Sequence, residues 1–80
     1  MINNIIAKGD VVKFVLWNGK ISWNLEGVVA GIDRCFDSQG IITNIEYCIL
    51  GQHYLDTTKQ CYYKHIEQKY ILEVLKRGME

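Results

Sequence analysis

Three cysteines and two histidines are the first candidates for chemistry in this chain, as ligands for a zinc ion. They follow the pattern C-x12-C-x4-H-x7-C-x3-H and are Cys35, Cys48, His53, Cys61 and His65. Structural zinc sites take their ligands in close pairs, because one tight turn then presents both side chains to the ion. Only Cys61 and His65 have such a spacing. We therefore expect half-buried thiols and no metal site, and a zinc-binding mini-domain is the second alternative.

The same residues include two Cys–His pairs of the kind that supplies a nucleophile and its base. Cys61 precedes His65 by four positions, and Cys48 precedes His53 by five. Catalysis also needs a third orienting group and a pocket that holds substrate. No nucleophile motif surrounds either pair, and the glycines do not form a phosphate-binding loop. The sequence therefore predicts neither an enzyme nor a cofactor.

Basic residues interleaved with tyrosines are the ingredients of a nucleic-acid stacking platform, and they occur together in the last third of the chain. The contact residues of such a site would be Lys59, Lys64 and Tyr63. Phosphate neutralisation needs a net excess of positive charge, whereas the whole chain has nine basic and nine acidic residues. Binding of nucleic acid is therefore the first alternative, and a protein partner is favoured.

Strands must position these side chains, because Ile, Val and Thr make up 20 of the 80 residues. The length fits one domain over residues 1–80, with residues 1–7 as a flexible lead-in. The longest stretch without Asp, Glu, Lys or Arg has nine residues, whereas a membrane span needs about 20. There is no secretory signal either, so we expect no membrane contact and a cytoplasmic protein. The odd cysteine number agrees with a reducing compartment.

The clearest local feature is a hairpin that turns at Asn18-Gly19, the preferred pair for a two-residue type I′ turn. This register pairs Phe14 with Trp23 and Val12 with Leu25 on an apolar face. Trp17 lies opposite Lys20 on the other face. Gly27 then interrupts the second strand, and we expect a β-bulge there that moves the core to even positions. Those positions are Val28, Ala30, Ile32 and Phe36.

A second period-two strand follows the turn at residues 37–40 and covers residues 41–50. Its inward face carries Ile41, Thr43, Ile45, Tyr47 and Ile49. The last third permits two interpretations. One is a pair of strands over residues 59–65 and 70–75. The other is a helix over residues 65–77, whose apolar stripe would end at Gly78.

Two segments of the chain resemble the opening of SH3-like barrels of the KOW and Tudor type. They are Lys8-Gly9-Asp10-Val11-Val12-Lys13-Phe14 and Glu26-Gly27-Val28-Val29-Ala30-Gly31-Ile32-Asp33. The resemblance implies an all-β domain, a small five-stranded SH3-like barrel that a C-terminal helix could close. It carries over no binding residue. The basic, glycine-rich loop that KOW domains use on RNA is not present in this sequence.

Protein contact is the function that the residues favour. Exposed Trp and Tyr are preferred at interaction hot spots, and the expected contact residues are Trp17, Val15, Lys20 and Tyr62. The isoleucines of the lead-in, Ile2, Ile5 and Ile6, are the alternative cover for this surface. The partner is a host or assembly protein or a second copy of the chain. Ile, Lys, Asn and Tyr make up 28 of the 80 residues, a bias typical of AT-rich bacterial or phage genomes.

Overall fold

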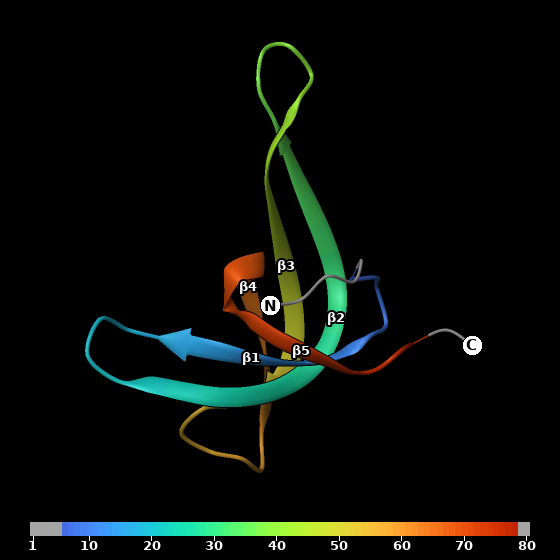
Figure 1. Cartoon of the computed structure of the whole chain (residues 1–80). Helices are drawn as coiled ribbons and strands as arrows, with labels where there is room; N and C mark the ends of the chain where they lie inside the picture. The colour runs from blue at the N-terminus through green and yellow to red at the C-terminus, as the bar shows by residue number, and fades with distance from the viewer. Residues whose placement is uncertain (1–5, 79–80) are drawn as a thin grey trace.

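A computed structural model describes residues 6–78, which form one antiparallel sheet in the order β4-β3-β2-β1-β5 (Figure 1). The strands are β1 (Val11–Trp17), β2 (Ser22–Phe36), β3 (Ile42–Gln52), β4 (Gln60–Glu67) and β5 (Ile71–Lys76). The prediction of an all-β fold is therefore confirmed. β4 and β5 are the two edge strands, and within residues 6–78 no pairing joins them. Residues 1–5 of the expected lead-in, with Ile2 and Ile5, lie outside the described residues.

The β1–β2 hairpin forms, but the predicted register is wrong by two residues. Phe14 pairs with Leu25, and Trp17 pairs with Ser22 in place of Lys20. The turn centre is Gly19-Lys20, because Asn18 Oδ1 accepts the backbone N–H groups of Lys20 and Ile21 and holds Asn18 before the turn. Only Gly19 of these residues has a positive φ, 98°. A slip of two residues preserves the alternation, so the predicted faces of β1 are correct.

Gly27 does not produce the expected bulge. β2 keeps its odd positions inward through Val29, and the bulge lies at Ala30, where Val29 pairs with Ile49 and Gly31 with Cys48. Gly27 instead permits a close approach of β2 and β3. A Cβ atom on it would lie 2.6 Å from both Ile49 Cγ2 and Leu50 O. Val28 is consequently exposed, contrary to the prediction. Past the bulge, Ile32 packs against the core as expected, whereas Phe36, at the far end of β2, is exposed, contrary to the prediction.

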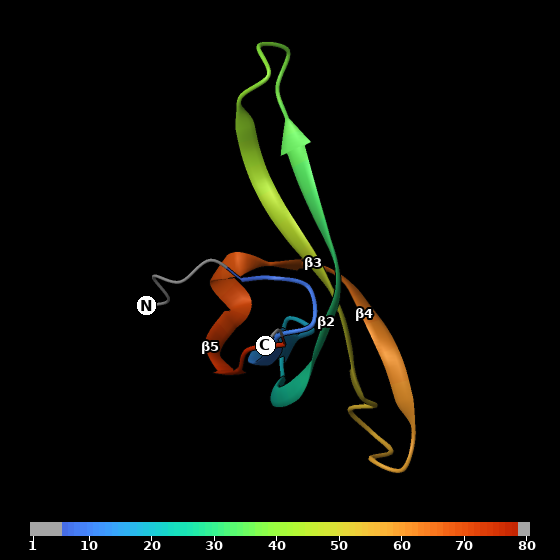
Figure 2. The same ribbon diagram turned by 90° about the vertical axis from the view of Figure 1, so that its right-hand side faces the viewer.

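Beyond the sheet body, β2 and β3 continue as a two-stranded arm over residues 33–46 (Figures 1 and 2). The molecule measures 43 × 36 × 22 Å, and the arm is its most prominent projection. Asp37 Oδ1 closes the turn at the tip by accepting the backbone N–H groups of Gln39 and Ile41. Gly40 supplies the positive φ that this turn requires, 81°.

The last third consists of strands, and the helical interpretation is wrong. A single 3₁₀ turn, η1 (Gln68–Tyr70), separates β4 from β5. β4 contains one extra residue, since Tyr47 pairs with Ile66 but Ile49 pairs with Tyr63. His65 lies in this bulge with a φ of 63°, in the left-handed region that favours glycine.

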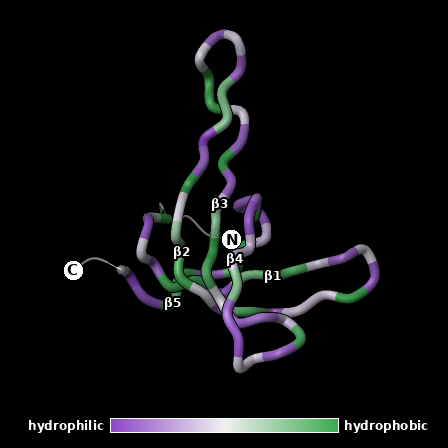
Figure 3. Tube along the Cα trace, turned by 180° about the vertical axis from the view of Figure 1, so that it is seen from behind, coloured by the Kyte–Doolittle hydropathy of each residue, from purple (hydrophilic) through white to green (hydrophobic). Residues whose placement is uncertain are grey.

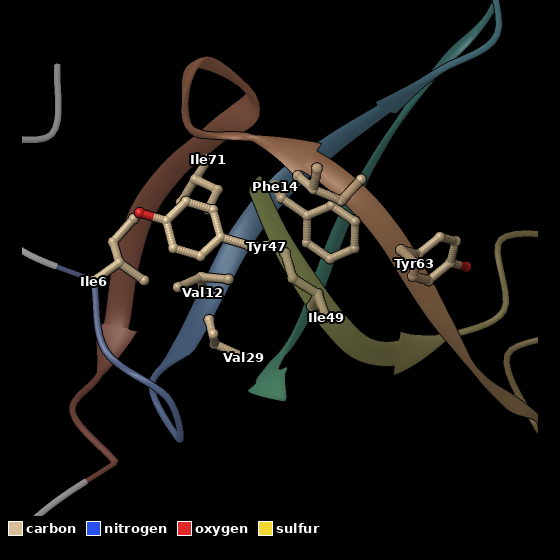
Figure 4. Packing of buried hydrophobic residues seen from close by; sticks show 9 residues of the cluster. Ile6, Val12, Phe14, Val29, Tyr47, Ile49, Tyr63 and Ile71 are labelled. Atoms are coloured by element: carbon tan, nitrogen blue, oxygen red, sulfur yellow. The ribbon is translucent and has the colours of Figure 1, made fainter. Parts of the chain in front are cut away.

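The core lies on the concave side of the bent sheet, where all five strands contribute side chains (Figure 4). Phe14 and Tyr63 pack together with ring centroids 5.4 Å apart. The inward face predicted for the strand over residues 41–50 is confirmed at Tyr47 and Ile49, whereas Ile41 and Thr43, beyond the core, are exposed, contrary to the prediction. The buried cluster is Ile6, Val12, Phe14, Val29, Tyr47, Ile49, Tyr63, Ile66 and Ile71.

Asp10 is 2% exposed and ties both ends of the described chain together. Its carboxylate accepts the backbone N–H groups of Ala7 and Gly78 and the guanidinium of Arg77, each at 2.9 Å. Burial alone raises the pKa of Asp10, but these hydrogen bonds outweigh it, so the pKa lies below its ordinary value.

Candidate protein-contact surface

A small pocket of about 170 Å³ lies where the end of β1, the end of β4 and η1 meet. Most of its lining residues have apolar side chains, but polar atoms supply at least half of the surface that the pocket exposes. Two of the predicted contact residues, Trp17 and Val15, line it. The full lining is Val15, Leu16, Trp17, His65, Ile66 and Tyr70.

The β1 wall of this pocket is open because β5 begins too late to cover it. β5 pairs with β1 only as far as Phe14, opposite Ile71. Among the described residues, no strand pairs with residues 15–17 on the side away from β2. Trp17 is therefore 58% exposed at the strand end. The pocket opens beside main-chain groups that an extended segment can pair with.

The opposite wall of the pocket is formed by the bulge in β4 and by η1. His65 Nδ1 lies 2.9 Å from Glu46 Oε1 on the neighbouring strand, which fixes the imidazole at the rim. Lys69 Nζ lies 5.3 Å from the ring centroid of Tyr70 and 3.4 Å from Glu67 Oε1. These contacts hold His65 and Tyr70 in place without filling the space between them.

The size and chemistry of the pocket indicate what it can hold. Ligand sites for small molecules usually measure about 300–1,000 Å³, and this pocket is smaller. A cavity of about 150 Å³ is sufficient for benzene. Among the described lining residues, His65 is the one titratable group apart from the Tyr70 hydroxyl, and none is a cysteine, serine or threonine. The pocket is therefore large enough for one aromatic or aliphatic side chain.

The other two predicted contact residues lie outside the pocket. Lys20 is exposed at the centre of the β1–β2 turn, close in sequence to Trp17. Tyr62 is 59% exposed and pairs with Leu50, which places it on the outer face of the sheet. The four predicted residues thus divide between two places.

Tyr62 belongs to an apolar row that crosses the outer face. Direct strand pairing aligns Val11 with Val28, Val28 with Leu50, and Leu50 with Tyr62. A shallow hollow of about 260 Å³ lies beside this row and includes Val11, Val28 and Leu50 in its lining. The row is the second exposed apolar surface of the sheet body.

The residues of the nucleic-acid alternative do not form one exposed platform. Tyr63 is buried, and its hydroxyl donates to Gln52 O at 2.6 Å. Both faces of its ring are thus withdrawn from stacking on a base. Lys64 is exposed on β4, whereas Lys59 lies in the β3–β4 loop, where its Nζ is 3.9 Å from Asp56 Oδ2.

The five candidate zinc ligands are dispersed over the fold. Within residues 6–78, no three His, Cys, Asp or Glu side chains come together as a metal site. Cys35 is exposed on the arm, and Cys48 and Cys61 lie half-buried on β3 and β4. His53 stacks on Tyr54 in the β3–β4 loop, and its Nδ1 accepts the backbone N–H of Leu55. The half-buried state expected for the thiols is confirmed at Cys48 and Cys61 alone.

Sequence reasoning missed the β4 and η1 side of the pocket. Ile66 and Tyr70 carry the signal, an apolar residue followed by an aromatic one four positions later, which also fits the helical interpretation of residues 65–77 given above.

Within the described residues, no helix has the length and apolar character to cross a bilayer. Comparison of the chain with protein-family models, curated proteins and solved structures finds no match.

Proposed function

We propose that this chain is a non-enzymatic protein-interaction module, whose pocket at the end of β1 takes one large apolar side chain of an extended partner segment. The observation that carries this proposal is the coincidence of the pocket with a strand edge at residues 15–17 that no other strand of residues 6–78 pairs with. The edge can pair with the main chain of the partner, while the pocket selects a side chain. Strand addition of this kind is a recurring mode of peptide recognition.

Trp17 and Tyr70 make the pocket suitable for such contacts. Aromatic side chains bring large contact areas and lose few rotatable bonds when they are buried, and Trp and Tyr are enriched at the centres of interfaces. Trp17 already stands exposed in the unbound chain. Covering it removes apolar surface from water, which favours association.

An SH3-like barrel is the architecture that we propose for this module. Three features support it: the pairing of the first strand with the last, the strong bend of β2, and the bulge at Ala30. A long strand bent at a bulge is how small barrels turn their corners. We also propose a cytoplasmic location, which the three free cysteines support.

Selection from a library of displayed random peptides tests the proposed function. We expect the immobilised chain to enrich peptides that share one large apolar residue. Trp17→Ala should abolish this enrichment, because it removes a pocket wall. Tyr62→Ala is the matched control, since Tyr62 is 59% exposed against 58% for Trp17 but lies outside the pocket. Enrichment that survives Trp17→Ala, or that Tyr62→Ala removes equally, would contradict the proposal.

A further inference from the structure

We propose that residues 71–78 form a strap, which opens from β1 as one unit while the sheet of β1–β4 stays folded. The strap consists of β5 and the two residues that follow it. The hydrogen bonds that Asp10 accepts from Arg77 and Gly78 are its clasp. The chain thus has two states, the closed one seen in the structure and an open one in which the strap has left β1.

β5 is the less firmly held of the two edge strands. It pairs with β1 and lies along one margin of the sheet body (Figure 3). The ladder between the two strands shifts register twice, between Val11 and Val12 and between Lys13 and Phe14. The ladder of β4, the other edge strand, has one such shift. Each shift interrupts the regular hydrogen bonding of a pair of strands.

β5 also contributes little to the core. Ile71 is its one buried residue, Val74 is half-buried, and the other four are exposed. Ile71 belongs to the buried cluster in Figure 4, but the other eight members of that cluster come from residues 6–66. Segments with few buried apolar side chains open at a lower free energy than the core of a protein does. We therefore expect the core to persist when β5 leaves.

The far end of the strap is held by polar contacts and by a close backbone approach. Asp10 Oδ1 accepts the backbone N–H of Gly78, and Asp10 Oδ2 accepts Arg77 Nη1, both at 2.9 Å. Gly78 lies directly against Gly9, so that a Cβ atom on Gly78 would overlap the Gly9 carbonyl. These contacts lie at the opposite end of β5 from Ile71. The strap is thus held at its two ends and weakly between them.

Release of the clasp does not leave a buried charge without partners. Asp10 also accepts the backbone N–H of Ala7, which lies on the same side of β1 in the sequence and does not move with the strap. Because Arg77 and Gly78 lie against Asp10, their departure admits water to the carboxylate. Water then replaces the lost donors, and a hydrated carboxylate does not incur the cost of a buried, unpaired one.

Opening uncovers a longer edge of β1. In the closed state, no described strand pairs with residues 15–17 on the side away from β2. In the open state, this edge extends over all of β1, Val11–Trp17, which has seven residues. Strands usually have about 5–6 residues, so the open edge is long enough to pair with another chain. The closed strap therefore protects β1 from such pairing.

Opening also frees Tyr70, which directly precedes β5 and lines the pocket. The strap therefore determines whether the pocket is complete, and this consequence rests on the proposed function. The opening itself is measured without a ligand. The strap and the proposed function can consequently fail separately.

Native-state hydrogen exchange of the whole chain, followed by amide NMR at low urea concentrations, tests the strap. The reporters are the Gly78 amide, which donates to Asp10, and the β5 amides that pair with β1. We expect these strap amides to share one opening constant, at least about tenfold larger than that of the β2–β3 amides. Their exchange should depend only weakly on urea, because the opening exposes little surface.

Two glycine-to-alanine variants distinguish strap opening from global unfolding. Gly27→Ala crowds Ile49 and Leu50 within the part that stays folded. It should raise the exchange rates of the β2–β3 amides by about thirtyfold and leave the strap amides unchanged. Gly78→Ala crowds Gly9 and destabilises the closed state. It should raise the exchange rates of both sets by the same factor, because global unfolding also starts from the closed state.

Arg77→Ala is a milder variant of the clasp, since Asp10 keeps its backbone donors. It should raise the exchange rates of both sets by about fivefold. Three results would overturn the proposal: one opening constant for the strap and the β2–β3 amides, protection that rises gradually from Gly78 to Ile71 without a shared value, or faster strap exchange in Gly27→Ala. The first and third would show that the sheet opens as a single unit, and the second that β5 frays from its end.

Discussion

Asp10 and Arg77 are 67 positions apart in the sequence, yet the guanidinium Nη1 donates to the Asp10 carboxylate at 2.9 Å. The same carboxylate accepts the backbone N–H groups of Ala7 and Gly78. A buried charge is tolerated only when it is paired and hydrogen-bonded. This group meets that requirement by joining the segment before β1 to the segment after β5.

Asp10→Asn should lower the free energy of unfolding by about 2 kcal/mol, because it removes a buried, hydrogen-bonded charge. The asparagine amide also sets donors against the donors of Ala7 and Arg77. Arg77→Ala is the milder comparison, at about 1 kcal/mol, since Arg77 is half exposed and Asp10 keeps its two backbone donors. Urea denaturation at pH 7 measures both. An Asp10→Asn chain as stable as the unmodified one would disprove the role of this carboxylate.

Stability should fall at acid pH through the same residue. The pKa of Asp10 in the folded chain is below its ordinary value of 3.8. The folded state therefore binds this proton less tightly than the unfolded state does. The resulting stabilisation is fully present above pH 3.8 and is lost as the pH falls through the folded pKa. The stability difference between the unmodified chain and Asp10→Asn should thus shrink below pH 3.8, as followed by acid titration.

Gly27→Ala should destabilise the fold by about 2 kcal/mol, because a Cβ there overlaps Ile49 and the Leu50 carbonyl. Gly31→Ala is the matched control on the same strand. Its Cβ would lie 3.8 Å from Cys48 Cβ, which is ordinary contact, so the change should be nearly neutral. Thermal unfolding of the two variants distinguishes them. Equal destabilisation by the two variants would show that the close approach of β2 and β3 does not exclude a side chain at residue 27.

Tyr63→Phe should cost about 1 kcal/mol at neutral pH, since it removes the hydrogen bond to Gln52 O. Burial raises the pKa of Tyr63 from 10.0 to about 12. The folded state thus holds this proton more tightly, and its stabilisation, present below pH 10.0, is lost as the pH rises to about 12. In urea titrations within that pH window, the free energies of unfolding of the unmodified chain and of Tyr63→Phe should converge. Tyr62→Phe, on an exposed tyrosine, should leave the free energy of unfolding at neutral pH unchanged.

His65→Gly should be more stable than His65→Ala by about 1 kcal/mol, because the backbone φ of 63° suits glycine and strains alanine. Both variants lose the imidazole and its pairing with Glu46, so their difference isolates the backbone. Chemical denaturation measures it. If alanine proves as stable as glycine at this position, the bulge relaxes when the imidazole is removed.

The sequence pattern predicted the alternation of the strands better than their pairing. The apolar faces of β1 and of the strand through Tyr47 and Ile49 are correct, because alternation follows from burial of one face. The register of the first hairpin is off by two because the Asn18 side chain accepts hydrogen bonds from Lys20 and Ile21 and shifts the turn. A side chain that competes for backbone groups is not visible in an apolar pattern.

Contacts between distant segments could not be predicted in this way. Asp10 follows a glycine and so has the sequence signature of a turn residue, and its burial depends on Gly78 and Arg77 arriving from the far end of the chain. The pocket could not be predicted either, because residues distant in the sequence form it together. Trp17 and Val15 follow from alternation along one strand, whereas Tyr70 joins them only through the path of η1.

The pairing of β1 with the last strand has a consequence for folding kinetics. Closing so long a loop is entropically unfavourable, and pairings distant in sequence slow folding. Tyr70 directly precedes β5, so the pocket wall is completed in the same late step that docks Ile71 against Phe14. A partly folded chain that still lacks β5 therefore has no pocket. Under the proposed function, recognition through this surface would be restricted to molecules that have finished folding.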